Sequence, residues 1–475
     1  MIVMAALLIS LTGCGVTVRI YGKPLDSLSD IDHGYGIIYL TQIMDAFRAD
    51  DLETVNDMGY HAGLEDAETF EGLFEEWHEL SSVYGQPESI FISEGYQYGN
   101  EKAYIGEMEM ENGGSLMLAL LFTSNDELAL ADLYETEKGF WSRISVPESV
   151  AEEEITLGEG TDFPLSAKIT YPKDMEEGEK LPAVVLVGGD GGNTMDMRSG
   201  SVRPYQDIAW GLAEKGIVTI RFDKRTYTYS DLESAEEAPA EVFTIDWEYA
   251  EDALLAAEAL LGKPFVDANR IYYFGHSQGG VVGSRIQEKA VSAKINGFEN
   301  GFAGFILAST SPRPWYDVIY DQYIRYGLID RQSDEIYYLV QKIGMERDYV
   351  KEGDYLKVKE EKLTKEFALT RPAAFWKDYF SYDYVDGYRK LAESGAPLLI
   401  LQGSTDYQIT VEDDYAVWEA TISSWNTSSV TMKEFDGLNH LLTPSQGIFA
   451  GHYKEYDRPG RVPQEVIDEI AAWIR

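Results

Sequence analysis

The feature that most constrains the fold of this chain is the pentapeptide Gly-His-Ser-Gln-Gly at residues 275–279. It follows an apolar run at 270–274 that predicts a strand, and the segment from Gly279 onward predicts a helix. A sharp turn in this setting forces Ser277 into a strained conformation, with its hydroxyl projecting at the C-terminal end of the strand. Gly275 and Gly279 are needed because side chains there would collide across the turn. The pattern therefore predicts Ser277 as a nucleophile.

A serine hydroxyl is a weak nucleophile and needs a base, which directs attention to the six histidines of the chain. Three of them precede the region around the pentapeptide: His33, His61 and His78. The side chain of His276, inside the pentapeptide, cannot turn onto the hydroxyl of its neighbour. Of the remaining two, His440 follows a predicted strand at 430–435, whereas His452 lies in a loop rich in glycine and tyrosine. We predict His440 as the base and His452 as a surface residue.

A third residue must orient the imidazole and offset its positive charge. Asp406 follows a predicted strand at 397–402, which gives the chain order Ser, Asp, His. Three other acids compete for this role: Asp413, Asp414 and Asp436. Two backbone N–H groups should stabilise the oxyanion, one being the amide of Gln278. The second should come from the glycine-rich residues 188–192, which follow a predicted buried strand at 183–187.

Strands and helices alternate from Ile155 onward. Such alternation predicts an α/β fold, with a mostly parallel sheet flanked by helices. An insertion at about 312–386 breaks the alternation and reads as helical and rich in aromatic residues. It suits a lid over an apolar pocket, and it suits equally a helical subdomain that packs its own core. We assign 155–475 to this region and 145–154 to a polar linker before it.

Residues 30–144 predict a small α+β domain. Apolar residues recur at helical spacing around Leu40 and Leu73, and strand-like runs follow at 89–93, 103–110, 115–122 and 139–144. This order and size resemble the cone-shaped NTF2-like fold that often precedes secreted bacterial hydrolases. His61 and His78 lie in this domain and are predicted to be structural.

The N-terminus carries a candidate address signal. Residues 1–11 are nearly all apolar, and Leu-Thr-Gly-Cys follows at 11–14. An apolar stretch of this length is too short to span a membrane and fits a signal peptide. It resembles a bacterial lipoprotein signal, although no Lys or Arg precedes Cys14. The resemblance implies removal of residues 1–13, lipidation of Cys14 and anchoring on the extracytoplasmic side of the membrane. The alternative is a buried apolar strand with an inert cysteine.

Charge and cysteine content exclude several functions. The formal charge of −43 opposes binding to nucleic acid and polybasic attraction to anionic lipid. The single cysteine excludes an intramolecular disulfide and a cysteine-based zinc site. The composition predicts no metal site.

The region from 155 to 475 resembles the α/β-hydrolases, and most closely the bacterial secreted esterases with an N-terminal accessory domain. The stretches that carry the resemblance are residues 223–226, 403–408 and 437–440. It implies a Ser277–His440–Asp406 triad that cleaves small carboxylic esters through an acyl-enzyme without a cofactor. By position, the Asp190 amide is the second oxyanion donor, although the family usually has serine there. A carboxylate at that place would oppose the oxyanion unless it points away or is protonated.

Fold does not fix the substrate. Peptidase, thioesterase or acyltransferase chemistry on the same triad remains an alternative, as does a non-catalytic lipoprotein that only binds a ligand.

Overall fold

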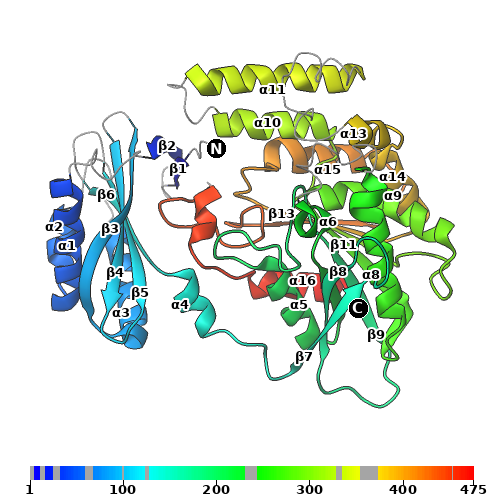
Figure 1. The fold of residues 1–475 in the computed structure, drawn as a ribbon, viewed down its shortest axis with the longest axis horizontal. Helices are drawn as coiled ribbons and strands as arrows, with labels where there is room; N and C mark the ends of the chain where they lie inside the picture. Colours follow the sequence, from blue (N-terminus) through cyan, green and yellow to red (C-terminus); the bar gives the residue numbers. More distant parts are fainter. Residues whose placement is uncertain are drawn as a thin grey trace.

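The computed structural model describes residues 5–10, 17–24, 33–58, 68–98, 101–122, 128–230, 243–327, 334–353, 373–451 and 453–475. It shows a smaller N-terminal region and a larger C-terminal region, each built on its own sheet (Figure 1). We use "N-terminal region" for residues 33–142 and "C-terminal region" for residues 150–475.

The C-terminal region contains an eight-stranded sheet in the order β14-β13-β12-β11-β9-β10-β8-β7. Its strands are β7 (Val150–Leu157), β8 (Leu165–Pro172), β9 (Leu181–Val187), β10 (Val218–Phe222), β11 (Val266–His276), β12 (Phe305–Ala308), β13 (Leu398–Gly403) and β14 (Val430–Phe435). The six strands β9 to β14 are parallel, whereas β7 and β8 form an antiparallel edge. The predicted mostly parallel sheet is therefore confirmed.

Helices cover both faces of this sheet (Figure 1). One face packs against α5 (Pro204–Glu214) and α16 (Gln464–Ile474), and the other against α8 (Glu251–Leu261) and α9 (Gln278–Ala293). Strand β9 shows the reason: Val185 faces the second layer and Val184 and Leu186 face the first, so the whole strand is apolar. The shorter helical segments are α6 (Arg225–Thr228), η1 (Asp246–Ala250), η3 (Val411–Tyr415), α15 (Ala416–Ile422) and η4 (Tyr453–Asp457).

The predicted insertion is helical in its described part. Between β12 and β13 lie α10 (Trp315–Gly327), α11 (Asp334–Glu352), α13 (Ala373–Tyr379) and α14 (Tyr384–Glu393). Helices α10 and α11 pack together above the sheet, and α14 packs on α9 (Figure 1). The insertion therefore lies over the end of the sheet where β11 and β12 finish.

The N-terminal region consists of helices followed by an antiparallel sheet. The helices are α1 (His33–Ala49), α2 (Leu52–Met58) and α3 (Glu68–Tyr84), and the strands are β3 (Pro87–Tyr98), β4 (Glu101–Met110), β5 (Ser115–Phe122) and β6 (Leu128–Glu135). Their apolar residues form one core in which Phe47 stacks on Trp77. A hairpin of β1 (Ala5–Ser10) and β2 (Thr17–Pro24) joins the edge strand β3. Cys14 and His61 lie outside the described residues.

Two local expectations differ from the structure. The predicted strand at 139–144 is wrong: α4 (Glu137–Ser142) occupies this segment, and the fourth strand is β6. The Thr136 side chain caps α4 by accepting the Gly139 N–H, a local bond that favours a helix start. The segment assigned to the linker, 145–154, contains the beginning of β7, and its Glu152 pairs with Arg221 at 2.8 Å. In the described part of the chain, no helix combines the length and apolarity needed to cross a membrane.

Candidate active site

Ser277 occupies a strained turn between β11 and α9. Its φ of 53° and ψ of −123° lie in a region that side-chain-bearing residues rarely adopt. The Ser277 N–H donates to Ala308 O at 2.9 Å, and the hydroxyl of Thr310 donates to Ser277 O at 2.9 Å. A Cβ atom on Gly275 would lie 2.5 Å from Gly279 O, so the turn requires glycine there. The turn thus holds Ser277 at the C-terminal end of β11.

His440 and Asp406 meet beside this turn, although 34 residues separate them in sequence. The Nδ1 atom of His440 lies 2.8 Å from Asp406 Oδ2, and both side chains are buried. The Asp406 Oδ1 atom accepts the N–H groups of Gln408 and Ile409 at 2.8 and 2.9 Å. This bonding fixes the carboxylate in orientation beside Nδ1, which leaves Nε2 of His440 as the acceptor nitrogen.

The competing acids hydrogen-bond elsewhere. Asp414 is buried and accepts from the guanidinium of Arg313 at 2.8 Å. Asp436 is exposed and accepts from the Ser404 hydroxyl at 3.2 Å. Asp413 is exposed in the first turn of η3, where its backbone N–H donates to the capping side chain of Thr410. His452 lies outside the described residues, so the structure gives no position for the rival base.

The sequence argument set His276 aside, but the structure gives this residue a place in the site. Its Nε2–H donates to the backbone carbonyl of His440 at 2.7 Å, and the two ring centroids lie 4.6 Å apart. Burial, with a further contribution from the charge of His440, lowers the pKa of His276 from 6.5 to about 3. The ring is therefore neutral at ordinary pH. The sequence feature that could have indicated this place is the position of His276 directly before Ser277, at the end of a buried strand.

The glycine-rich residues 188–192 pass directly beside the nucleophile. A Cβ atom on Gly189 would lie 3.0 Å from Ser277 Cβ, so only glycine brings the backbone this near. The carboxylate of Asp190 turns onto its own loop, where Oδ1 accepts the Gly191 N–H at 2.8 Å. Gln278 begins α9, and the first N–H groups of a helix have no carbonyl partner within it. The structure thus brings the two predicted oxyanion residues to either side of Ser277.

A pocket of about 200 Å³ opens above these residues. Ser277, His276 and His440 line it together with Asp190, and α10 contributes Trp315. Other lid aromatics lie elsewhere: Trp376 is fully buried in the core, and Tyr316 lines a separate cavity. In the described part of the insertion, Trp315 therefore lines the pocket of Ser277, while Trp376 packs in the core.

His78, in the N-terminal region, makes its hydrogen bond outside the candidate active site. His78 is exposed and pairs with the exposed Asp50 at 2.6 Å. Within the described ranges, no group of three or more His, Cys, Asp or Glu side chains is arranged to hold a metal ion.

Known proteins that are similar to this chain include esterases and a peptidase. No family model matches the chain. Esterase EstD of Thermotoga maritima is 32% identical over 330 residues, which cover 69% of this chain and 68% of that protein. Among solved structures, a hyperthermophilic esterase from the archaeon Pyrobaculum calidifontis is 18% identical, with a TM-score of 0.38, covering 68% of this chain and 85% of that one. A puromycin-hydrolysing peptidase of Mycobacterium tuberculosis is 16% identical, with a TM-score of 0.41, covering 82% and 47%.

Proposed function

Because this chain belongs to the α/β-hydrolase family of esterases, we propose that it cleaves small carboxylic esters through an acyl-enzyme on Ser277. The observation that carries the proposal is the strained Ser277 turn in the wall of the pocket that also holds His440, itself bonded to buried Asp406. A non-glycine residue at such a φ costs roughly 1–3 kcal/mol. A fold that only bound a ligand would gain nothing from keeping this strain.

In the proposed mechanism, the Ser277 hydroxyl attacks the acyl carbon while His440 Nε2 accepts its proton. Asp406 fixes the tautomer of His440 through Nδ1 and stabilises the imidazolium that forms. The backbone amides of Gln278 and Asp190 stabilise the oxyanion. His440 then returns the proton to the leaving alcohol, and water, activated by the same histidine, hydrolyses the acyl-enzyme.

A fluorophosphonate probe followed by a substrate panel tests this proposal. Wild-type protein should be labelled at Ser277 and should hydrolyse p-nitrophenyl esters faster than thioesters or aminoacyl amides. Ser277→Ala and His440→Ala should each lower kcat by roughly four orders of magnitude or more, because triad members act as a unit. Asp406→Asn should cause a similar or smaller loss.

The results also separate the alternatives. Preference for aminoacyl amides or thioesters would favour the peptidase or thioesterase reading, and transfer to an added alcohol would favour an acyltransferase. Unlabelled, inactive wild-type protein would favour a binding lipoprotein. Full activity in His440→Ala with loss in His452→Ala would move the base to His452.

We further propose that the protein is anchored to a bacterial membrane through a lipid on Cys14. The support is the Leu-Thr-Gly-Cys sequence at 11–14, which places the single cysteine of the chain at the lipidation position. Two or more acyl chains on one residue give stable anchoring. Protein expressed from residue 1 in a bacterial host should fractionate with membranes, and Cys14→Ser should release it without loss of hydrolysis. Wild-type protein that keeps Met1 and stays in the cytosol would contradict the proposal.

We also propose an NTF2-like accessory domain for residues 30–144. The support is the order of α1 to α3 before the antiparallel β3–β6 sheet, with the helices packed on one sheet face. An experimental structure of this region, compared with known cone-shaped folds, tests the assignment.

A further inference from the structure

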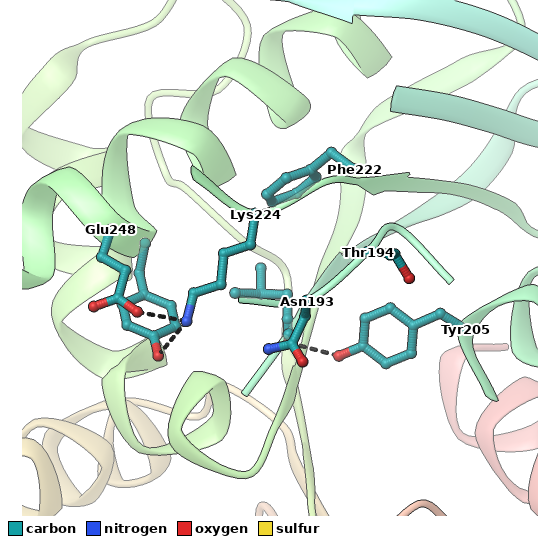
Figure 2. Close-up of a pocket in the computed structure, with 9 residues that line it drawn as sticks. Asn193, Thr194, Tyr205, Phe222, Lys224 and Glu248 are labelled. Carbon is teal, nitrogen blue, oxygen red and sulfur yellow. Dashed lines mark hydrogen bonds and ion pairs between the residues drawn. The ribbon is translucent and has the colours of Figure 1, made fainter. Parts of the chain in front are cut away.

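A buried lysine lies directly behind the loop that passes the nucleophile (Figure 2). The Lys224 ammonium donates to Gly189 O at 2.6 Å and to Gly191 O at 3.1 Å. These two carbonyls flank Asp190 on either side. The cavity that Lys224 lines has a volume of about 10 Å³, enough for no more than one water molecule. The ammonium therefore bonds to oxygen atoms of the protein itself and does not face a ligand.

The same ammonium is linked to the residue after the nucleophile. Lys224 Nζ lies 2.8 Å from the hydroxyl of Tyr249, which in turn hydrogen-bonds the side-chain carbonyl of Gln278. A carboxylate oxygen of Glu248 also lies 2.6 Å from the Lys224 Nζ atom. Figure 2 draws this ion pair. All four side chains are buried. One positive charge is thus connected to both residues whose amides are proposed to bind the oxyanion.

The chemistry of the peptide group gives this arrangement a consequence. Gly189 C=O and Asp190 N–H belong to one trans peptide, so they point in opposite directions. An ammonium bonded to the carbonyl end polarises the whole amide and makes its N–H a stronger donor, since chained hydrogen bonds reinforce one another at low dielectric. The loop already has neutral donors, because Asn193 Nδ2 reaches Gly189 O at 3.1 Å and Thr226 Oγ1 reaches Gly191 O at 2.9 Å. The distinct contribution of Lys224 is its charge.

We propose that Lys224 is a positioning residue whose charge strengthens the oxyanion-binding amide of Asp190 and, through Tyr249, fixes Gln278. This inference rests on the proposed function, because it assumes that these amides meet a developing negative charge. Glu248 neutralises the ammonium in the resting protein, which makes the burial of the pair tolerable. The interaction gains value only when the oxyanion forms, so it should appear in kcat and not in KM.

The test removes the charge without leaving a lone buried ion. Lys224→Met alone would leave the buried Glu248 carboxylate without its partner and destabilise the fold. The informative variant is therefore Lys224→Met with Glu248→Gln. Glu248→Gln alone keeps Lys224 on both carbonyls but leaves the buried ammonium without its carboxylate partner. Tyr249→Phe removes the link to Gln278 together with the tyrosine's own hydrogen bond to Gly189 O at 3.1 Å. A control removes an ion pair away from the site, between buried Asp207 on α5 and exposed Arg461 just before α16, 2.7 Å apart, through Asp207→Asn with Arg461→Met.

The readouts are kcat and KM for a p-nitrophenyl ester and the affinity for a trifluoromethyl ketone. Ser277 adds to the carbonyl of this ketone, whose oxygen takes up the electron pair as the oxyanion while His440 accepts the serine proton. The Lys224→Met/Glu248→Gln variant should lose about 10- to 100-fold in kcat with KM within about threefold, less than the loss of a direct donor. Its ketone affinity should fall by a similar factor. Tyr249→Phe should lose about three- to tenfold in kcat, while the control should stay near wild type. Glu248→Gln should lower the melting temperature, because it leaves a buried ammonium alone, with kcat near wild type.

If the Met/Gln variant does not fold, Lys224→Gln with Glu248→Gln decides, because it keeps a neutral donor and removes only the charge. Unchanged kcat and ketone affinity in the folded double variant would overturn the inference, as would a loss confined to KM or to the melting temperature. These outcomes leave the proposed function intact if wild-type protein is still labelled at Ser277. Failure of labelling in wild type would instead reject the proposed function itself.

Discussion

At the scale of single residues, the ring of His276 holds the backbone that carries the proposed base. Its Nε2–H bond to His440 O joins two residues 164 positions apart in sequence. We expect His276→Leu to lower kcat about tenfold with little change in KM, because His440 loses one of its anchors and its alignment loosens. His276→Gln, whose amide reaches to a similar position, should retain most activity. Steady-state kinetics on both variants make the check, and equal losses in the two would contradict a hydrogen-bonding role.

Glu455 gives the protein a pH-dependent stability. Burial raises the pKa of this carboxyl from 4.5 to about 7, against the hydrogen bonds from Ser445 and Gly451. A raised carboxyl pKa means that the folded state binds the proton more tightly than the unfolded state does. The resulting stabilisation is fully present below about pH 4.5 and is lost as the pH rises to about 7. A shift of this size corresponds to roughly 3 kcal/mol.

We therefore expect Glu455→Gln to gain stability relative to wild type as the pH rises from 4.5 to 7.5, since the amide has no proton to lose. Thermal denaturation of both proteins across this range measures the difference. Parallel curves for the two proteins would show that Glu455 titrates normally.

At the scale of elements, the functional residues follow the C-terminal ends of parallel strands. Ser277 follows β11, the Gly189–Asp190 peptide follows β9, Asp406 follows β13 and His440 follows β14. Parallel strands end at one edge of the sheet, so four segments that are distant in sequence converge there. The helices of the insertion, which begins after β12, lie over the same edge and contribute Trp315 to the pocket.

Two tryptophans on different helices of the insertion differ in position: one lines the pocket and the other lies in the core. Trp315 at the start of α10 lines the pocket with Ser277, whereas Trp376 in α13 is fully buried among Phe375, Tyr379 and Phe380. We expect Trp376→Ala to destabilise the protein by about 3–5 kcal/mol with unaltered chain-length preference. Trp315→Ala should also lower the melting temperature, but it should in addition shift the preference toward longer acyl chains. Ester panels with melting curves provide the measurement, and an unaltered preference in Trp315→Ala would remove the reason for placing the acyl group there.

At the scale of the whole molecule, the segment after His440 joins the two regions. Ile448 and Phe449 pack on the sheet face of the N-terminal region that its helices leave uncovered, against residues such as Ile105 and Leu121. Beside them, Arg458 reaches across to Glu76 at 2.7 Å and pairs with Asp132. Tyr456, from the same segment, lines the pocket of Ser277. The N-terminal region is therefore packed against a wall of the candidate active site.

This interface should couple the unfolding of the two regions. Arg458→Met leaves Asp132 buried without its partner, and we expect a loss of about 3–5 kcal/mol. Adding Asp132→Asn should restore part of it, because the more deeply buried of the two carboxylates that Arg458 pairs with is then neutral. Urea denaturation followed by fluorescence measures both, and the single variant should separate one transition into two. A single variant with wild-type stability would show that the pair contributes nothing at this interface.

Several features were predictable because they depend on residues that are neighbours in sequence. The glycine spacing at 275–279 fixes a turn whose sterics involve only a few consecutive residues, and it led to Ser277. The apolar runs and their alternation with helices led to the mostly parallel sheet. The same local logic failed at 139–144, where the Thr136 cap outweighed a strand-like composition. The order Ser, Asp, His selected candidates for the base and the acid, but it gave no distances.

Tertiary structure alone decided which distant groups meet. The choice of Asp406 over its rivals as the carboxylate beside His440 depends on how β13 and β14 align. The bond from His276 to His440 O and the cluster around Lys224 depend on packing between segments far apart in the chain. No periodicity or motif encodes such contacts, because their energy depends on burial and geometry that exist only after the sheet has formed. The sequence by itself determined the candidate nucleophile, Ser277, and the kind of fold, and packing of the folded chain decided what surrounds that serine.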